Sequence, residues 1–108
     1  FCTNPGLILA LDTPALDRFI AAASARLAEA PAQTMLTPGI LRAYAEGVAR
    51  LAGHATQRAQ GLAADGLQGV AALFETDAAR FTSQHALAEE VFGAASLVVR
   101  CPDLATLA

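Results

Sequence analysis

The sequence predicts an α/β fold with a largely parallel sheet and flanking helices. Three short apolar runs, at residues 7–11, 70–75 and 96–100, are typical of strands in the interior of a sheet. Apolar residues at helical spacing lie between these runs, and two Thr-Pro pairs, at Thr13 and Thr37, mark helix starts. Strands that alternate with helices are typical of parallel sheets, and not of helix bundles or sandwiches.

The first strand and the first helix have the clearest signals. The run at residues 7–11 is continuously apolar, so we expect a parallel strand that is buried on both faces. Thr13 is the expected N-cap of a helix that has Pro14 at its first position and ends before Pro31. Apolar residues recur along this helix at Leu16, Phe19, Ile20, Ala23 and Leu27.

The second helix is expected to begin after Thr37 and to end at Gly53, which would adopt a left-handed conformation. Residues 54–69 are richer in Gly, Gln and Asp, so they predict a turn-rich connection. At most a short turn of helix is expected there, at residues 59–64.

The remaining elements complete the alternation of strands and helices. After the strand at residues 70–75 we expect a short helical turn at residues 86–90, followed by the strand at residues 96–100. Asp103 is the expected cap of a final helix.

Composition excludes several classes of function. Although 55% of the residues are hydrophobic, no uninterrupted apolar run approaches the ~20 residues that span a bilayer. The seven basic residues are all Arg and do not cluster, and the net charge is −3, so we expect no nucleic-acid partner. No Cys and His residues have zinc-ligand spacing, so no metal site is expected. The two cysteines, far apart in sequence, favour reduced thiols and a cytoplasmic protein.

A cysteine directly before the first strand is the leading candidate for chemistry. The segment FCTNPG at residues 1–6 resembles the nucleophile motif of the aldehyde dehydrogenase superfamily, and the resemblance identifies Cys2 as the catalytic thiol. The motif's usual Gly-Gln pair would precede Phe1. We therefore expect residues 1–108 to be part of a nucleophile-bearing catalytic domain, with the cofactor domain outside them.

A second motif supports the same family. The segment EEVFG at residues 89–93 resembles the Glu-x-Phe-Gly-Pro signature that follows the cysteine by roughly a hundred residues, with Ala94 in place of the proline. The resemblance implies that Glu90 hydrogen-bonds the nicotinamide ribose of NADP or NAD. It also implies that Phe92 packs beside the nicotinamide ring.

Three further segments resemble one branch of the superfamily. Residues 3–6, 72–77 and 92–96 are similar to enzymes that oxidise α-ketoglutarate semialdehyde (2,5-dioxopentanoate). The expected chemistry is addition of a thiolate to the aldehyde, hydride transfer, and hydrolysis of the resulting thioester. The catalytic base and an oxyanion-binding Asn would lie earlier in the chain, so we expect this segment to be inactive alone.

Two other functions stay open at this stage. The Ala-rich helices could form a non-catalytic scaffold or oligomer-contact module in which Cys2 is inert. Alternatively, the thioester could be passed to coenzyme A instead of water. The family resemblance also implies a homo-oligomer, either a dimer or a tetramer.

Other polar residues have simpler explanations. Cys101 ends a strand and is expected to be structural, because cysteine is among the most buried residue types. His54 and His85 are 31 positions apart and have no acidic partner at a spacing typical of a catalytic site, so we expect surface or capping roles. Asp12 and Asp77 follow strands, where α/β sites often lie, but turn capping explains them equally well.

Overall fold

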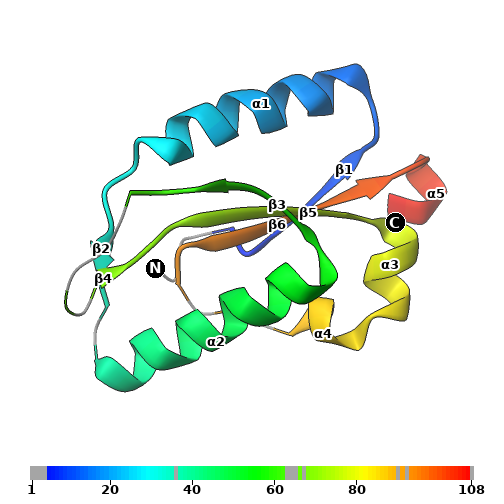
Figure 1. Cartoon of the computed structure of the whole chain (residues 1–108). Coiled ribbons are helices and arrows are strands. Elements are labelled where there is room, and N and C mark those ends of the chain that lie inside the picture. The colour runs from blue at the N-terminus through cyan, green and yellow to red at the C-terminus, as the bar shows by residue number, and fades with distance from the viewer. Residues whose placement is uncertain are drawn as a thin grey trace.

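A computed structural model describes residues 5–35, 37–62, 66, 68–89, 91 and 93–107 of the chain (Figure 1). Its strands are β1 (Leu7–Leu11), β2 (Gln33–Thr34), β3 (Thr56–Gln60), β4 (Gln68–Gly69), β5 (Ala72–Asp77) and β6 (Ala95–Cys101). Its helices are α1 (Pro14–Ala28), α2 (Pro38–His54), α3 (Ala78–Ser83), α4 (His85–Ala88) and α5 (Leu104–Leu107).

The main sheet has the strand order β1-β6-β5-β3. Strands β1, β6 and β5 are parallel, and β3 joins the edge of β5 in the antiparallel direction. A separate antiparallel pair is formed by β2 and β4. The predicted α/β class with a largely parallel sheet is confirmed.

The two long helices begin where the Thr-Pro pairs predicted. The hydroxyl of Thr13 accepts a hydrogen bond from the backbone N–H of Leu16 at 3.3 Å, and Thr37 does the same for Ile40 at 3.1 Å. These caps satisfy amide groups that the first helical turn leaves unpaired. Each helix start could therefore be predicted from the four residues that begin with the capping threonine.

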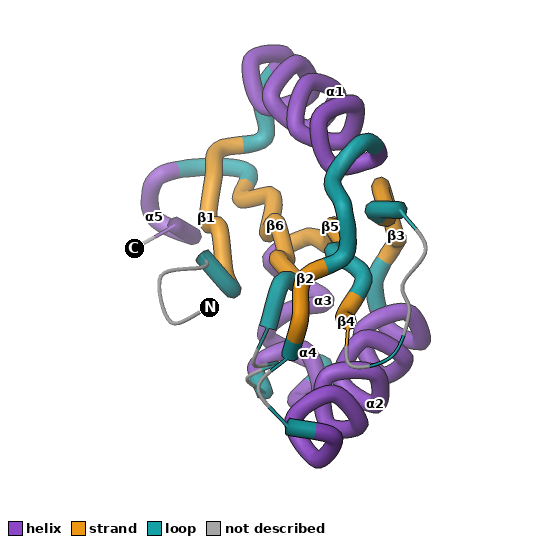
Figure 2. Tube along the Cα trace, turned by 90° about the vertical axis from the view of Figure 1, so that its left-hand side faces the viewer, coloured by secondary structure: helices purple, strands orange, loops and turns teal. Residues whose placement is uncertain are grey.

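Helices α1 and α2 cover opposite faces of the main sheet, as the end-on view in Figure 2 shows. Alternation along β5 and β6 separates the two cores, because neighbouring side chains in a strand point to opposite faces. The core under α1 contains Leu16, Ile20, Leu73 and Val98. The core under α2 includes Tyr44, Leu51, Phe74, Leu97 and Val99.

Strand β1 corrects the prediction of two-sided burial. It is an edge strand of the described sheet, and Leu7 and Leu9 are 47% and 46% exposed. Only Ile8 and Ala10 pack against the core under α1. A fully apolar run has the same sequence appearance whether one face or both faces are covered, so the pattern could not distinguish these cases.

Strand β3 was not predicted. Its sequence, Thr-Gln-Arg-Ala-Gln, has little of the apolar character expected of a strand, so the interpretation of this stretch as a turn-rich connection was wrong. Pairing with β5 holds it, with an irregularity between Gln57 and Ala59. The predicted helical turn at residues 59–64 is wrong at residues 59 and 60, which belong to β3, and residues 63 and 64 lie outside the described residues.

Several boundaries differ from the prediction. Gly53 lies inside α2, whose extended C-cap is Ala55. Strand β5 begins two residues later than expected, and the unpredicted helix α3 follows it directly. The predicted turn at residues 86–90 corresponds to α4, and the predicted cap Asp103 accepts a hydrogen bond from the Thr106 N–H at 2.8 Å.

Candidate active site

The three residues predicted to form the site, Cys2, Glu90 and Phe92, lie outside the described residues. The segment that carries Cys2 continues into described structure from Pro5 onward, and the segment that carries Glu90 and Phe92 is described at Glu89, Val91 and Gly93. The geometry of these flanking segments shows which parts of the chain meet there.

The ends of the two motif-bearing segments meet at one edge of the sheet. Strands β1 and β6 are parallel neighbours, with Leu7 opposite Leu97, so both strands start at the same edge. The backbone N–H of Leu97 donates to the carbonyl oxygen of Gly6 at 3.0 Å. The hydroxyl of Ser96 donates to the carbonyl oxygen of Pro5 at 2.6 Å. The two motifs therefore enter the sheet side by side.

Helix α2 supports the described part of the second motif through two close contacts. A Cβ atom at Gly47 would lie 2.8 Å from Cγ1 of Val91. Any residue larger than glycine at this position would therefore require Val91 to move. Gly93 has φ of +146°, and a Cβ atom there would lie 2.5 Å from Cδ1 of Tyr44. Val91 and Gly93 thus lie directly on one face of α2.

Tyr44 is the centre of this support. Its hydroxyl donates to the carbonyl oxygen of Val70 at 2.6 Å, and its side chain belongs to the core under α2. Burial raises the pKa of Tyr44 to about 12, because the phenolate would lose its hydration. The ring is therefore fixed at its hydroxyl end while it contacts Gly93.

This raised pKa gives a test of the support. A pKa above the unfolded value of about 10 means that Tyr44 stabilises the fold fully below pH 10 and loses this contribution as pH rises toward 12. At pH 8 we expect Tyr44→Phe to be less stable by about 0.5–1.5 kcal/mol, because the Val70 carbonyl loses its donor. The deficit should shrink between pH 10 and 12.

Urea denaturation of the wild type and of Tyr44→Phe at pH 8 and pH 11 measures this difference. A deficit that is the same at both pH values would contradict a buried, hydrogen-bonded phenol at this position.

Glu89, the first carboxylate of the second motif, has an ion-pair partner on α2. Arg50 approaches it at 3.6 Å. Glu89 is thereby attached to the same helix that supports Val91 and Gly93, which is consistent with the choice of Glu90 as the carboxylate for a ligand.

The carboxyl end of the sheet contains a separate charged cluster around Arg100. The guanidinium group contacts Glu75 on β5, Asp12 after β1 at 2.8 Å and Asp17 on α1 at 2.8 Å. The hydrogen bond to Glu75, followed by those to Asp12 and Asp17, raises the pKa of Arg100 above its usual value. This cluster therefore connects the end of β1 and helix α1 to the inner strands β5 and β6.

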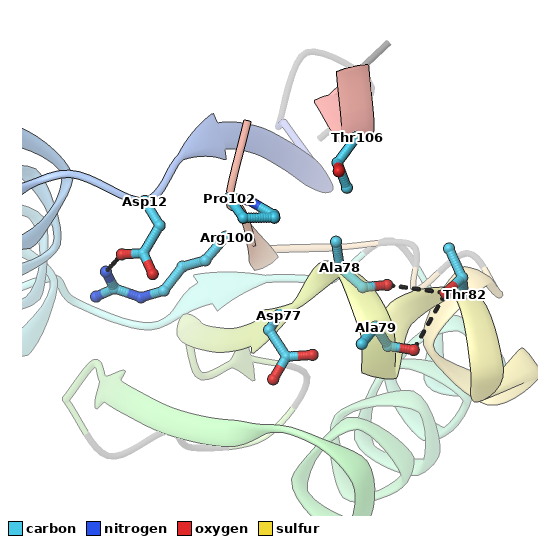
Figure 3. Close-up of a pocket in the computed structure, with 8 residues that line it drawn as sticks. All are labelled: Asp12, Asp77, Ala78, Ala79, Thr82, Arg100, Pro102 and Thr106. Carbon is cyan, nitrogen blue, oxygen red and sulfur yellow. Dashed lines mark hydrogen bonds and ion pairs between the residues drawn. The ribbon is translucent and has the colours of Figure 1, made fainter. Parts of the chain in front are cut away.

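An open cavity of about 420 Å³ lies beside this cluster, and Figure 3 shows its lining. Asp12 faces the Arg100 guanidinium, whereas the Asp77 carboxylate caps α3 by accepting from the Arg80 N–H at 2.8 Å. Of the two explanations for these aspartates, capping is confirmed for Asp77, and Asp12 has an ion pair instead.

Replacing Arg100 should lower stability more than replacing an exposed arginine. The side chains of Arg100 and Glu75 are only 17% and 18% exposed, so Arg100→Met leaves the Glu75 carboxylate poorly solvated, with Arg58 at 3.4 Å as its remaining ion-pair partner. We expect a loss of about 1–2 kcal/mol, because Asp12 and Asp17 remain well solvated and contribute little. The matched control is Arg18→Met at an exposed position of α1, with a change within about 0.5 kcal/mol. Equal losses in chemical denaturation would refute the importance of the cluster.

The remaining candidates have structural explanations. Cys101 is a free thiol, 2% exposed, in the core under α2, so its predicted structural role is confirmed. His54 ends α2, and His85 is exposed at the start of α4. Among the described residues no group of three or more His, Cys, Asp and Glu residues could hold a metal ion. No helix in the described ranges is long and apolar enough to cross a membrane.

Sequence reasoning missed the residues that support the motifs. Tyr44, Gly47 and Ser96 were not predicted to support either motif. Tyr44 and Gly47 are three positions apart and so share a helix face, but only the fold shows what lies against that face.

Similar proteins were found by comparison of sequences. No protein-family model matches the chain. The chain is 49% identical over 107 residues to alpha-ketoglutaric semialdehyde dehydrogenase 2 of Azospirillum brasilense, a match that covers 96% of this chain and 20% of that protein. It is 36% identical over 111 residues to the alpha-ketoglutaric semialdehyde dehydrogenase of Acinetobacter baylyi, which covers 99% of this chain and 21% of that protein. The chain spans about a fifth of the length of these curated relatives.

Solved structures show the same fold. Bifunctional proline utilization A (PutA) and a variant of the Bradyrhizobium japonicum PutA each match with a TM-score of 0.72 at 23% identity. Each match covers 88% of this chain and 10% of the PutA chain. The arrangement of strands and helices described above therefore occurs as one part of a much longer polypeptide.

Proposed function

Because the chain belongs to the aldehyde dehydrogenase superfamily, we propose that its protein oxidises an aldehyde to the carboxylate with NAD or NADP, with Cys2 as the nucleophile. We further propose that residues 1–108 are part of the nucleophile-bearing catalytic domain and that the cofactor domain lies outside them. The observation that carries the proposal is 49% identity across 96% of the chain to a semialdehyde dehydrogenase.

The proposed substrate is α-ketoglutarate semialdehyde. Both curated relatives carry this substrate in their names, and the two matches cover the chain almost from end to end. Because the matches cover 96% and 99% of the chain, the similarity is not limited to one short segment. Transfer of the acyl group to coenzyme A has no comparable support.

Cys2 would act through its sulfur. The thiolate adds to the aldehyde carbon to form a C–S bond, and the carbonyl oxygen becomes an oxyanion that needs hydrogen-bond donors. After oxidation Cys2 holds the acyl group as a thioester, which water cleaves to release the carboxylate and restore the thiol. A free thiol has a pKa of about 8.5, so the complete site must favour the thiolate or provide a base.

The chemistry of the motif residues fits a nicotinamide dinucleotide. The carboxylate of Glu90 can accept hydrogen bonds from ribose hydroxyls, and the ring of Phe92 offers an apolar surface to the nicotinamide. When bound, NAD or NADP supplies the hydride acceptor for the oxidation. The contacts of Val91 with Gly47 and of Gly93 with Tyr44 support this assignment, because they fix the backbone on both sides of Phe92.

We also propose a cytoplasmic homo-oligomer, a dimer or tetramer. The half-exposed Leu7 and Leu9 on an edge strand support association with further polypeptide. Analytical ultracentrifugation of the whole protein tests this, and a monomer at micromolar concentration would contradict it.

The test of the activity is turnover of α-ketoglutarate semialdehyde by the whole protein, with NAD and with NADP in separate assays. Formation of NADH or NADPH together with free α-ketoglutarate is expected. Oxidation of other aldehydes only would keep the reaction and reject the substrate. A product that requires coenzyme A would identify the acylating reaction, and no turnover of any aldehyde would favour the non-catalytic scaffold.

A further inference from the structure

The hydroxyl of Ser96 forms a bond between the two motif-bearing segments that the strand pairing itself does not provide. It donates to the carbonyl oxygen of Pro5 at 2.6 Å, across 91 positions of sequence. The regular pairing of β1 with β6 begins at Leu7 and Leu97, two residues after Pro5 and one residue after Ser96. The Ser96 side chain therefore extends the connection beyond the ladder, toward the segment that carries Cys2.

Apart from the backbone bond between the Leu97 N–H and the Gly6 carbonyl oxygen, little else in the described structure fixes this junction. Pro5 has no N–H group and can pair only through its carbonyl oxygen. A Cβ atom at Gly6 would have no neighbour within 4 Å, so side-chain packing does not fix this residue. Glycine is also the residue with the greatest backbone freedom. The Leu97 N–H holds the Gly6 carbonyl oxygen on the β1 side, and the Ser96 bond holds the peptide group between Pro5 and Gly6 on the other side.

The position of this bond connects it to catalysis. Pro5 follows Cys2 by three residues, and Ser96 follows Phe92 by four. One hydrogen bond thus joins the nucleophile segment to the cofactor-contacting segment, both close to the residues that must meet the substrate. Reacting atoms need to be held at about 3–3.5 Å, and a displacement of about 1 Å can lower a rate by about 100-fold.

We propose that Ser96 is a positioning residue, whose hydroxyl fixes the Cys2 segment against the Glu90 and Phe92 segment. This inference rests on the proposed function. Ser96 does not take part in bond making or breaking. It restricts the motion of the nucleophile segment at Gly6, so that the sulfur, the aldehyde and the nicotinamide share one geometry.

The test compares Ser96→Ala and Ser96→Thr in the whole protein, with Ser83→Ala as the matched control. The Ser83 hydroxyl makes a local bond to the Arg80 carbonyl at 3.3 Å on α3, so its loss should change nothing in catalysis. We expect Ser96→Ala to lower kcat by roughly 10-fold, with KM for aldehyde and cofactor within about twofold. Ser96→Thr keeps the hydroxyl and suits a strand, so it should retain kcat within about threefold.

Two outcomes would overturn the proposal while the function stands: a normal kcat in Ser96→Ala, or equal losses in Ser96→Ala and Ser96→Thr. A melting temperature that falls together with kcat in both variants would indicate a purely structural bond and would also overturn it. A wild-type protein that oxidises no aldehyde would refute the proposed function, and this inference with it.

Discussion

The Cys2→Ala variant is expected to lower aldehyde oxidation by roughly 10⁴-fold or more, because the substitution removes the sulfur that we propose forms the thioester. Binding of NAD or NADP should persist, since the substitution removes the sulfur but leaves Glu90 and Phe92, the residues proposed to contact the cofactor. Initial rates with the semialdehyde and fluorescence titration with NADPH measure the two effects separately. A variant that retains more than a few per cent of the activity would reject Cys2 as the nucleophile.

Cys101 provides the internal control for this result. It is 2% exposed, and its sulfur lies 3.8 Å from the Val99 carbonyl oxygen in the core under α2. Iodoacetamide should therefore modify the native protein at Cys2 far faster than at Cys101, as mass spectrometry of the two peptides would show. Cys101→Ala should reduce stability and leave kcat unchanged. Comparable labelling of both cysteines would contradict an activated thiol at position 2.

The Gly93→Ala variant is expected to have the largest effect on stability, about 2–4 kcal/mol. Its φ of +146° is strained for any residue with a Cβ atom, at a cost of about 1–3 kcal/mol. The added carbon would also lie 2.5 Å from the Tyr44 ring, which is held at its hydroxyl by Val70. Because the loop must move to relieve this contact, KM for the cofactor should rise by about 10-fold or more.

Gly53→Ala is the matched control, because it makes the same chemical change without the strain. Gly53 lies in α2, and a Cβ atom there meets nothing within 4 Å. Alanine should stabilise the helix by about 0.5–1 kcal/mol and leave the kinetics unchanged. In the double variant with Tyr44→Leu, the part of the stability loss that comes from the clash with the Tyr44 ring should be recovered. The part that comes from the strained φ should remain. If Gly93→Ala behaves like Gly53→Ala in denaturation, the α2 support is not important.

The parts of the fold that sequence predicted were those with local causes. Thr13 and Thr37 cap helices through contacts made three residues away, so their signal is contained in a short window. Strand β3 has no such signal, because its Thr-Gln-Arg-Ala-Gln sequence is held by β5 and not by its own propensity. The exposure of Leu7 and Leu9 depends on which strands are neighbours, and a pattern within one strand does not contain that information.

The residues of the candidate site also fall into two groups, those with a signal in the local sequence and those without one. Cys2, Glu90 and Phe92 were found because the motifs resemble a family, and the parallel pairing of β1 with β6 explains how distant motifs enter the sheet side by side. Ser96 and Gly47 act through partners that are 91 and 44 positions away in sequence, Pro5 and Val91. Contacts over such separations follow from the three-dimensional arrangement and have no local signature.

The pairing of β1 with β6 also sets the order of events during synthesis. Strand β1 is made at the beginning of this segment, but its described neighbour in the sheet is the last strand of the segment, about 90 residues later. At about 5–20 residues per second, translation needs roughly 5–20 s to supply that partner. Strand β1 therefore leaves the ribosome before β6, its described neighbour, has been made. The geometry proposed for Cys2 depends on this pairing, so we expect it to form only after β6 has been synthesised.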